Sequence, residues 1–176
     1  MLVEKYAQEV NRILAKYPPE ERQAAVMPLL YLVLRDQMVI DRKSMDEVAG
    51  ILGISTTDVA SVVGFYTLFH DKPGGKFRVQ VCTDLPCALR GAERFMEQMC
   101  ERLGIEPGET TPDGLFTVEP VMCLAACDKA PMFQIQSADG LEYHENQTVE
   151  NALSLIEGLR AQVAHMGGLK RRRDHE

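Results

Sequence analysis

Basic residues are in the minority in this chain, where 26 acidic side chains against 19 lysines and arginines give a formal net charge of −7. A protein that binds the phosphate backbone of nucleic acid is usually basic, so this charge argues against nucleic acid as a ligand. The G-x-G-x-x-G fingerprint is absent, and "KPGGKF" at residues 72–77 lacks the first glycine and the hydroxyl residue of a phosphate-binding loop. We therefore expect this chain to bind neither a nucleotide nor a flavin by itself.

Long apolar runs are also lacking. The stretch "VASVVGFYTLFH" at residues 59–70 is shorter than the roughly 20 residues that a membrane-spanning helix needs. Glu4 and Lys5 stand where a signal peptide would be apolar, so we predict no export signal, no membrane insertion and a cytoplasmic location. In that compartment, clustered cysteines more often bind metal or do redox chemistry than form disulfides.

The first 70 residues show the apolar periodicity of helices. A capping box is predicted at residues 44–47, a helix stop at Gly53 and a kink at Pro28. The predicted helices cover residues 2–17, 19–37, 44–53 and 56–69.

The pattern changes after the break "DKPGG" at residues 71–75. Alternating apolar residues predict strands, and Asp139-Gly140 is a turn signal for a hairpin. The predicted order is β-α-β-β-β-α, with a strand at 76–82, a helix at 87–103, a strand at 115–123 interrupted by Pro120, a hairpin at 131–145 and a helix at 148–163. We therefore predict an α+β fold, in which an N-terminal helical bundle (1–73) precedes a thioredoxin-like α/β domain (74–166) and a basic flexible tail (167–176).

Four of the five cysteines occur as two pairs, Cys82 with Cys87 and Cys123 with Cys127. Each pair follows one strand of the predicted strand-helix-strand unit. Because parallel neighbouring strands end at the same edge of a sheet, all four sulfurs are expected within reach of one centre. The thiol of Cys87 is also expected near a helix N-terminus, which favours its thiolate.

The spacing leaves several kinds of site open. Four thiolates hold either a zinc ion or a [2Fe–2S] cluster, and the spacing alone does not choose between them. A thiol redox pair normally has the spacing C-x-x-C, which is absent. Four buried apolar cysteines are the structural alternative. Cys100 lies beside a methionine stripe on the predicted helix, so we expect it to be a buried apolar residue.

Residues 44–66 have the outline of a helix-turn-helix motif. The second helix of this outline has no lysine or arginine and contains Asp58, so it offers no contact to phosphate. We expect these helices to pack in a bundle.

Four segments together resemble the 24-kDa subunit family of respiratory complex I, which in bacteria is part of the NADH-quinone oxidoreductase. They are "YPPEERQAAVMPLL", "VGFYTLFHDKPGGKFRVQVCTDLPCALRGAE", "LGIEPGETTPDGLFTVEPVMCLAACDKAP" and "ENQTVENALSLIEGL", within about residues 10–160. The family often has glycine where Ala125 stands, and a more threonine-rich loop where Asp84 and Leu85 stand.

The resemblance implies one [2Fe–2S] cluster held by Cys82, Cys87, Cys123 and Cys127. It implies an electron-transfer subunit that accepts an electron from the FMN of a partner NADH-binding flavoprotein subunit, in the peripheral arm of a larger respiratory complex. The chain would then be part of an enzyme without being catalytic by itself. Relatives of the family occur in NAD-linked hydrogenases and formate dehydrogenases, so the equivalent subunit of such an enzyme is an alternative. A zinc-binding interaction module is a second alternative.

Overall fold

The computed structural model describes the backbone of residues 2–173 and the side chains of residues 2–165. The chain divides into two compact units, one with the residues up to Lys76 and one with most of the residues from Phe77 on. Each unit has its own hydrophobic core.

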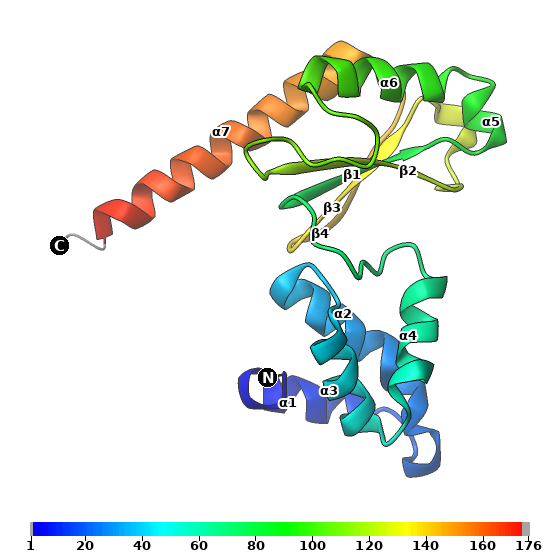
Figure 1. Cartoon of the computed structure of the whole chain (residues 1–176), viewed down its shortest axis with the longest axis vertical. Coiled ribbons are helices and arrows are strands. Elements are labelled where there is room, and N and C mark those ends of the chain that lie inside the picture. Colours follow the sequence, from blue (N-terminus) through cyan, green and yellow to red (C-terminus); the bar gives the residue numbers. More distant parts are fainter. Residues whose placement is uncertain (1, 174–176) are drawn as a thin grey trace. The chain divides into compact units, whose positions relative to one another are not determined.

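The N-terminal unit consists of helices around a core of leucine, valine and isoleucine side chains. The largest fully buried members of this core are Leu29, Leu30 and Ile40. Its elements are α1 (Leu2–Leu14), a 3₁₀ helix η1 (Pro19–Ala25), α2 (Val26–Gln37), α3 (Arg42–Leu52) and α4 (Thr56–Phe65), labelled in Figure 1.

Two details of these helices differ from the sequence prediction. The kink predicted at Pro28 is wrong, because Pro28 fits the first turn of α2, where its missing N–H needs no partner, and the chain breaks earlier, between η1 and α2. The predicted capping box at residues 44–47 is wrong. Asp41 is the N-cap of α3 and accepts a hydrogen bond from the Ser44 N–H at 2.8 Å. A carboxylate at this position is also favoured by the helix dipole.

Helix α4 begins and ends differently from its neighbours. Ser55 and Asp58 form a reciprocal capping box at its start. The predicted end at Phe69 is wrong, since the helix stops at Phe65 and Tyr66 is extended. The turn that follows buries Phe69 against Tyr31, with ring centroids 5.1 Å apart, and this contact replaces the last helical turn.

The C-terminal unit is a four-stranded sheet with the predicted order β-α-β-β-β-α, and the α+β class is confirmed. Strand β1 pairs in parallel with β2 and antiparallel with β3, in the sheet order β2-β1-β3-β4. The elements are β1 (Phe77–Cys82), α5 (Leu85–Ala88), α6 (Ala92–Leu103), β2 (Phe116–Val121), a 3₁₀ turn η2 (Cys127–Lys129), β3 (Phe133–Ser137), β4 (Gly140–His144) and α7 (Val149–Arg173).

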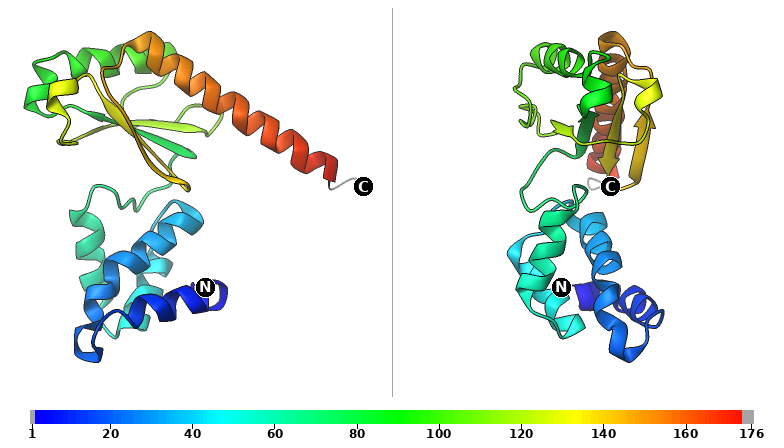
Figure 2. Two further views of the ribbon diagram at one scale, coloured as in Figure 1. Left: turned by 180° about the vertical axis from the view of Figure 1, so that it is seen from behind. Right: turned by 90° about the vertical axis from the view of Figure 1, so that its right-hand side faces the viewer.

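The core of this unit lies between one face of the sheet and two helices. Val79, Phe116 and Phe133 of the strands are buried with Met99 of α6 and Ile156 of α7 in one cluster. Figure 2 shows both helices beside the sheet from two further directions. Pro120 does not interrupt β2, because an edge strand tolerates a residue that donates no ladder hydrogen bond.

The helix predicted at residues 87–103 is two helices. Gly91 has a φ of 87°, which is the left-handed region that glycine adopts readily, and it separates α5 from α6. At the other end of the unit, α7 continues to Arg173 instead of stopping near Val163. The tail predicted at residues 167–176 therefore belongs to α7 up to Arg173, residues 174–176 lie outside the described residues, and the flexibility of the tail stays a prediction.

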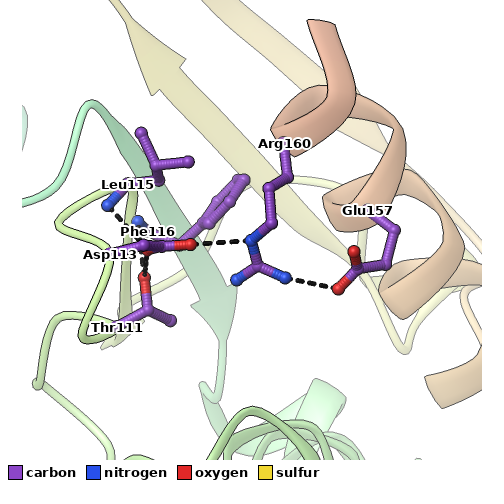
Figure 3. Close-up of polar contacts among 6 residues, drawn as sticks. All are labelled: Thr111, Asp113, Leu115, Phe116, Glu157 and Arg160. Atoms are coloured by element: carbon purple, nitrogen blue, oxygen red, sulfur yellow. Dashed lines mark hydrogen bonds and ion pairs between the residues drawn. The ribbon is translucent and has the colours of Figure 1, made fainter. Parts of the chain in front are cut away.

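A polar clasp joins the loop before β2 to α7 (Figure 3). Asp113 accepts hydrogen bonds from Thr111 Oγ1 and from the Leu115 N–H, and it accepts a third from Arg160 Nε at 2.7 Å. The Arg160 guanidinium also pairs with Glu157 and lies over the Phe116 ring, 5.4 Å from its centroid. This clasp explains why the "TTPDG" segment of the sequence is rich in turn-forming polar residues.

Candidate metal centre

The four paired cysteines come to one edge of the sheet. Cys82 is the last residue of β1 and stands opposite Val121, the last residue of β2. Cys87 lies in the short helix α5, Cys123 follows β2 by two residues, and Cys127 begins η2. Figure 1 shows α5 and the loop after β2 at the same end of the sheet. The parallel pairing of β1 and β2 therefore delivers both pairs to one place, as the sequence predicts.

The four paired cysteines lie close together. The thiols of Cys82 and Cys127 are near enough to Cys87 to raise its pKa. The sulfur of Cys127 lies 3.7 Å from that of Cys123. All four are free thiols. Cys82 and Cys87 are buried in a small apolar cluster with Ala92, Ala130 and Met132, and Cys127 packs against it.

Burial sets the protonation of Cys87. Desolvation by burial, followed by the neighbouring Cys82 and Cys127 thiols, raises the pKa of Cys87 to about 12. Cys87 does lie in the first turn of a helix, as predicted, but burial outweighs the effect of the helix N-terminus, so the thiol is favoured over the thiolate. The hydrogen bond with Cys123 is the largest cause that raises the pKa of Cys127. A redox-active thiol needs a lowered pKa, so these thiols do not fit that chemistry.

The donor set fits a cluster of iron and sulfide. It consists of soft sulfur donors, which suit zinc, copper(I) and iron–sulfur clusters. Among residues 2–165, no three His, Cys, Asp or Glu side chains are already arranged around one metal ion. A [2Fe–2S] cluster is held by four thiolates, and four cysteines are gathered at this edge of the sheet. Metal binding at this edge would displace the thiol protons.

The comparisons with known proteins concern nearly the whole chain. Residues 10–160 match the thioredoxin-like [2Fe-2S] ferredoxin family. This chain belongs to that family. Among curated relatives, the NADH-quinone oxidoreductase subunit 2 of Thermus thermophilus is 43% identical over 147 residues, covering 84% of this chain and 80% of the relative. A second NADH-quinone oxidoreductase subunit, from Rhizobium meliloti, is 38% identical over 154 residues, with 88% of each chain covered.

A solved structure supports the fold. An NAD⁺-reducing [NiFe]-hydrogenase aligns with a TM-score of 0.62 and 20% identity, covering 77% of this chain and 23% of the hydrogenase chain. At that identity the likeness concerns the fold alone. Membership of the ferredoxin family means that the cofactor is one [2Fe–2S] cluster. The ligand set stays a prediction, supported by the position of all four cysteines at one edge of the sheet.

The loop between Cys123 and Cys127 in this ferredoxin-like chain has a feature that the sequence does not reveal. Ala125 has a φ of 60°, which is left-handed and uncommon for a residue with a Cβ atom. Its N–H points to the Cys123 sulfur at a distance of 3.3 Å. The sequence has alanine at this position and gives no sign of this backbone, whereas the glycine that the resemblance implies there would adopt it readily.

Three contacts hold the end of this loop. Arg90 Nε donates a hydrogen bond to the Ala130 carbonyl at 3.2 Å, and Lys129 forms an ion pair with Glu145 at 2.8 Å. The Asn146 N–H donates to the Lys129 carbonyl at 2.7 Å. The cysteine loop of the ferredoxin domain is thus tied both to the start of α6 and to the segment after β4, a pairing that no sequence motif indicates.

Exposed apolar side chains occur around the cysteine edge. Leu85 is 69% exposed, Leu89 is 81% exposed and Met122 is 69% exposed. Each is within two residues of Cys87 or Cys123 in the sequence. We call these three residues the apolar rim. Burying so much apolar surface against a partner would stabilise a complex.

The remaining predicted features have structural roles. Cys100 is buried in the core beside Met99, as predicted, and burial raises its pKa to about 11. In the helix-turn-helix outline, Asp58 caps α4 and Val59 is buried in the helical core. No helix in the described part of the chain is long and apolar enough to cross a membrane. Taken together, α3 and α4 pass the test of length and composition, with a bend of 119° between them.

Proposed function

We propose that this chain is the electron-transfer subunit of an NADH-quinone oxidoreductase and that Cys82, Cys87, Cys123 and Cys127 hold its [2Fe–2S] cluster. The observation that carries the proposal is the gathering of all four paired cysteines at one edge of a ferredoxin-family sheet. Two relatives that share most of this chain are named as subunits of NADH-quinone oxidoreductase.

The residues of this chain have separate tasks in that function. The four thiolates bind the irons, and the apolar cluster around Cys82 and Cys87 keeps water from one side of the site. The Ala125 N–H stabilises negative charge on the Cys123 sulfur. When bound, a [2Fe–2S] cluster accepts and returns one electron at a time. The protein supplies binding, burial and electrostatics, and no side chain of this chain needs to move a proton.

The electron donor we propose is the reduced FMN of a partner NADH-binding flavoprotein subunit. The sequence of this chain contains no nucleotide-binding motif, so the hydride chemistry has to take place on another subunit. The residues of the apolar rim are exposed and are close in sequence to Cys87 and Cys123, so they are available to a redox partner that approaches this edge of the sheet. We also propose that helical residues 1–70 contact this partner and that the complex lies on the cytoplasmic side of the membrane, in its peripheral arm.

Two alternative functions differ from this proposal, the first in the partner enzyme and the second in the metal. As a subunit of an NAD-linked hydrogenase or formate dehydrogenase, the chain would do the same electron transfer in another complex. The likeness to the NAD⁺-reducing hydrogenase concerns the fold and does not favour this alternative. A zinc-binding interaction module would use the same thiols without redox chemistry.

Purification of the intact complex from the native cells, through a tag on this chain, tests the proposal. We expect a flavoprotein subunit and quinone-reducing activity in the same fractions, together with visible absorption and an EPR signal of a reduced [2Fe–2S] cluster in the tagged chain. Co-purification with a hydrogenase or formate dehydrogenase would show that the chain is a subunit of that enzyme and not of an NADH-quinone oxidoreductase. A colourless chain that contains zinc would overturn the electron-transfer function.

A further inference from the structure

The two cysteine pairs lie in different surroundings. Cys82 and Cys87 are 1% and 0% exposed, whereas Cys123 is exposed and Cys127 is intermediate. Burial disfavours added charge, because a low-dielectric interior solvates it poorly. One half of the site is therefore much less suited to extra negative charge than the other.

A backbone hydrogen bond adds to this difference. The Ala125 N–H lies 3.3 Å from the Cys123 sulfur. The φ of 60° at Ala125 is disfavoured for a residue with a Cβ atom, so the surrounding loop holds the amide in this direction. An N–H donor stabilises a sulfur that gains negative charge, which makes reduction of the attached iron easier.

Charged side chains do not reverse this difference. Asp84 lies between Cys82 and Cys87, and Asp128 directly follows Cys127, so each half has one carboxylate in its own loop. Lys129 is paired with Glu145 at 2.8 Å, which neutralises the cation next to Asp128. Exposure and the Ala125 amide therefore remain as the features that distinguish the two halves.

We propose that the electron taken up by the cluster resides on the iron held by Cys123 and Cys127, and that Ala125 is the positioning residue that favours this iron. The proposal rests on the proposed function, in which these four cysteines bind the cluster, and it assigns Cys123 and Cys127 to one iron because their sulfurs lie 3.7 Å apart. One electron from a reduced flavin converts one ferric iron to ferrous iron, no bond is broken, and the cluster becomes one charge more negative.

Selenocysteine, labelled with the magnetic selenium isotope, tests which iron is reduced. The full-length chain is prepared as Cys123→Sec and, separately, as Cys87→Sec, and each protein is reduced with dithionite. The ferric and ferrous spins are antiparallel in the reduced cluster, so selenium on the two irons has hyperfine couplings of opposite sign. We expect the ferrous sign in Cys123→Sec and the ferric sign in Cys87→Sec.

The reverse signs, or equal signs at both positions, would overturn the proposal. If the unsubstituted chain gives no [2Fe–2S] EPR signal after reduction, the proposed function fails instead, so the two failures are distinguishable. Because selenium replaces sulfur with little change of shape, both variants are expected to fold and to bind the cluster.

A second experiment tests Ala125 directly. Replacing its amide by an ester, with lactic acid in place of Ala125, removes the N–H and retains the methyl group. We expect the reduction potential to fall, measured by redox titration with EPR detection. The matched control is the same replacement at Ala152 in α7, whose N–H donates to the carbonyl of Thr148, the residue before α7, at 3.0 Å, and there we expect no shift. An unchanged reduction potential with the ester at Ala125, or an equal fall in the control, would show that the Ala125 N–H does not favour reduction of the cluster.

Discussion

At the scale of single residues, burial divides the five cysteines by role. Cys82, Cys87 and Cys100 are all buried, but only Cys82 and Cys87 lie against another of the paired thiols. Cys100 packs among methionine and phenylalanine side chains in the core of the C-terminal unit. A free cysteine in such a place behaves as a small hydrophobic residue.

Serine in place of Cys82, Cys87, Cys123 or Cys127 is expected to lose or disable the cluster, because an alcohol is a poor replacement for a thiolate at iron. Cys100→Ser is expected to keep the cluster, at a packing cost of about 1–3 kcal/mol for a buried hydroxyl. Visible absorption and iron content measure both effects. A colourless Cys100→Ser protein beside a normally coloured Cys123→Ser protein would contradict the assignment.

The acidic residues next to the cysteines are expected to keep the reduction potential low. Reduction adds a negative charge beside Asp84 and Asp128, and like charges disfavour it. Asp84→Asn and Asp128→Asn are each expected to raise the potential in a redox titration followed by EPR. If both substitutions lower the potential at equal cluster occupancy, hydrogen bonding to the sulfurs dominates over charge.

At the scale of secondary structure, the order of elements and the position of the cysteines could be predicted from the sequence. Alternation in β1 and the two cysteine spacings were sufficient to place four thiols at one sheet edge. The left-handed backbone at Ala125 and the break at Gly91 depend on loop geometry, which periodicity does not encode. The ion pair between Lys129 and Glu145 joins two loops that are separated in the sequence, so it could be found only in the folded structure.

The clasp around Asp113 is expected to make stability depend on pH. Burial tends to raise the pKa of Asp113, but hydrogen bonds from Thr111, Leu115 and Arg160 outweigh it, so the pKa lies below the usual value. A lowered pKa in the folded state means that the contribution is complete above the unfolded pKa of about 3.9 and is lost as the pH falls through the folded pKa.

Asp113→Asn should therefore reduce the free energy of unfolding by about 1 kcal/mol at neutral pH, because a partly exposed ion pair with Arg160 is lost. The difference from the unsubstituted protein should shrink as the pH falls below about 4. Urea unfolding at several pH values measures this. A difference that stays constant down to a pH of about 2 would show that the charge of Asp113 is irrelevant.

At the scale of the whole molecule, this chain needs a partner for its redox chemistry. It contains no nucleotide-binding motif in its sequence, and its cofactor takes electrons singly. The purified chain with its cluster is therefore expected not to oxidise NADH, as measured by the absorbance of NADH with an artificial acceptor. Activity should appear when the flavoprotein subunit is added. NADH oxidation by the pure chain alone would contradict the proposal that NADH is oxidised on the flavoprotein subunit.

The partner surface is expected to include exposed apolar residues from both units. Leu89 in the apolar rim is 81% exposed, and Phe65 at the end of α4 is 78% exposed. Both are costly to leave in water, and burying a large apolar side chain contributes about 1.5–3 kcal/mol. Leu89→Ser and Phe65→Ser should each weaken binding of the flavoprotein subunit by roughly 10-fold or more, with the cluster spectrum unchanged.

Leu141→Ser, on the β4 strand at the opposite end of the sheet, is the control and should bind normally. Titration calorimetry measures all three, and normal binding by Leu89→Ser would place the interface away from the cysteine edge.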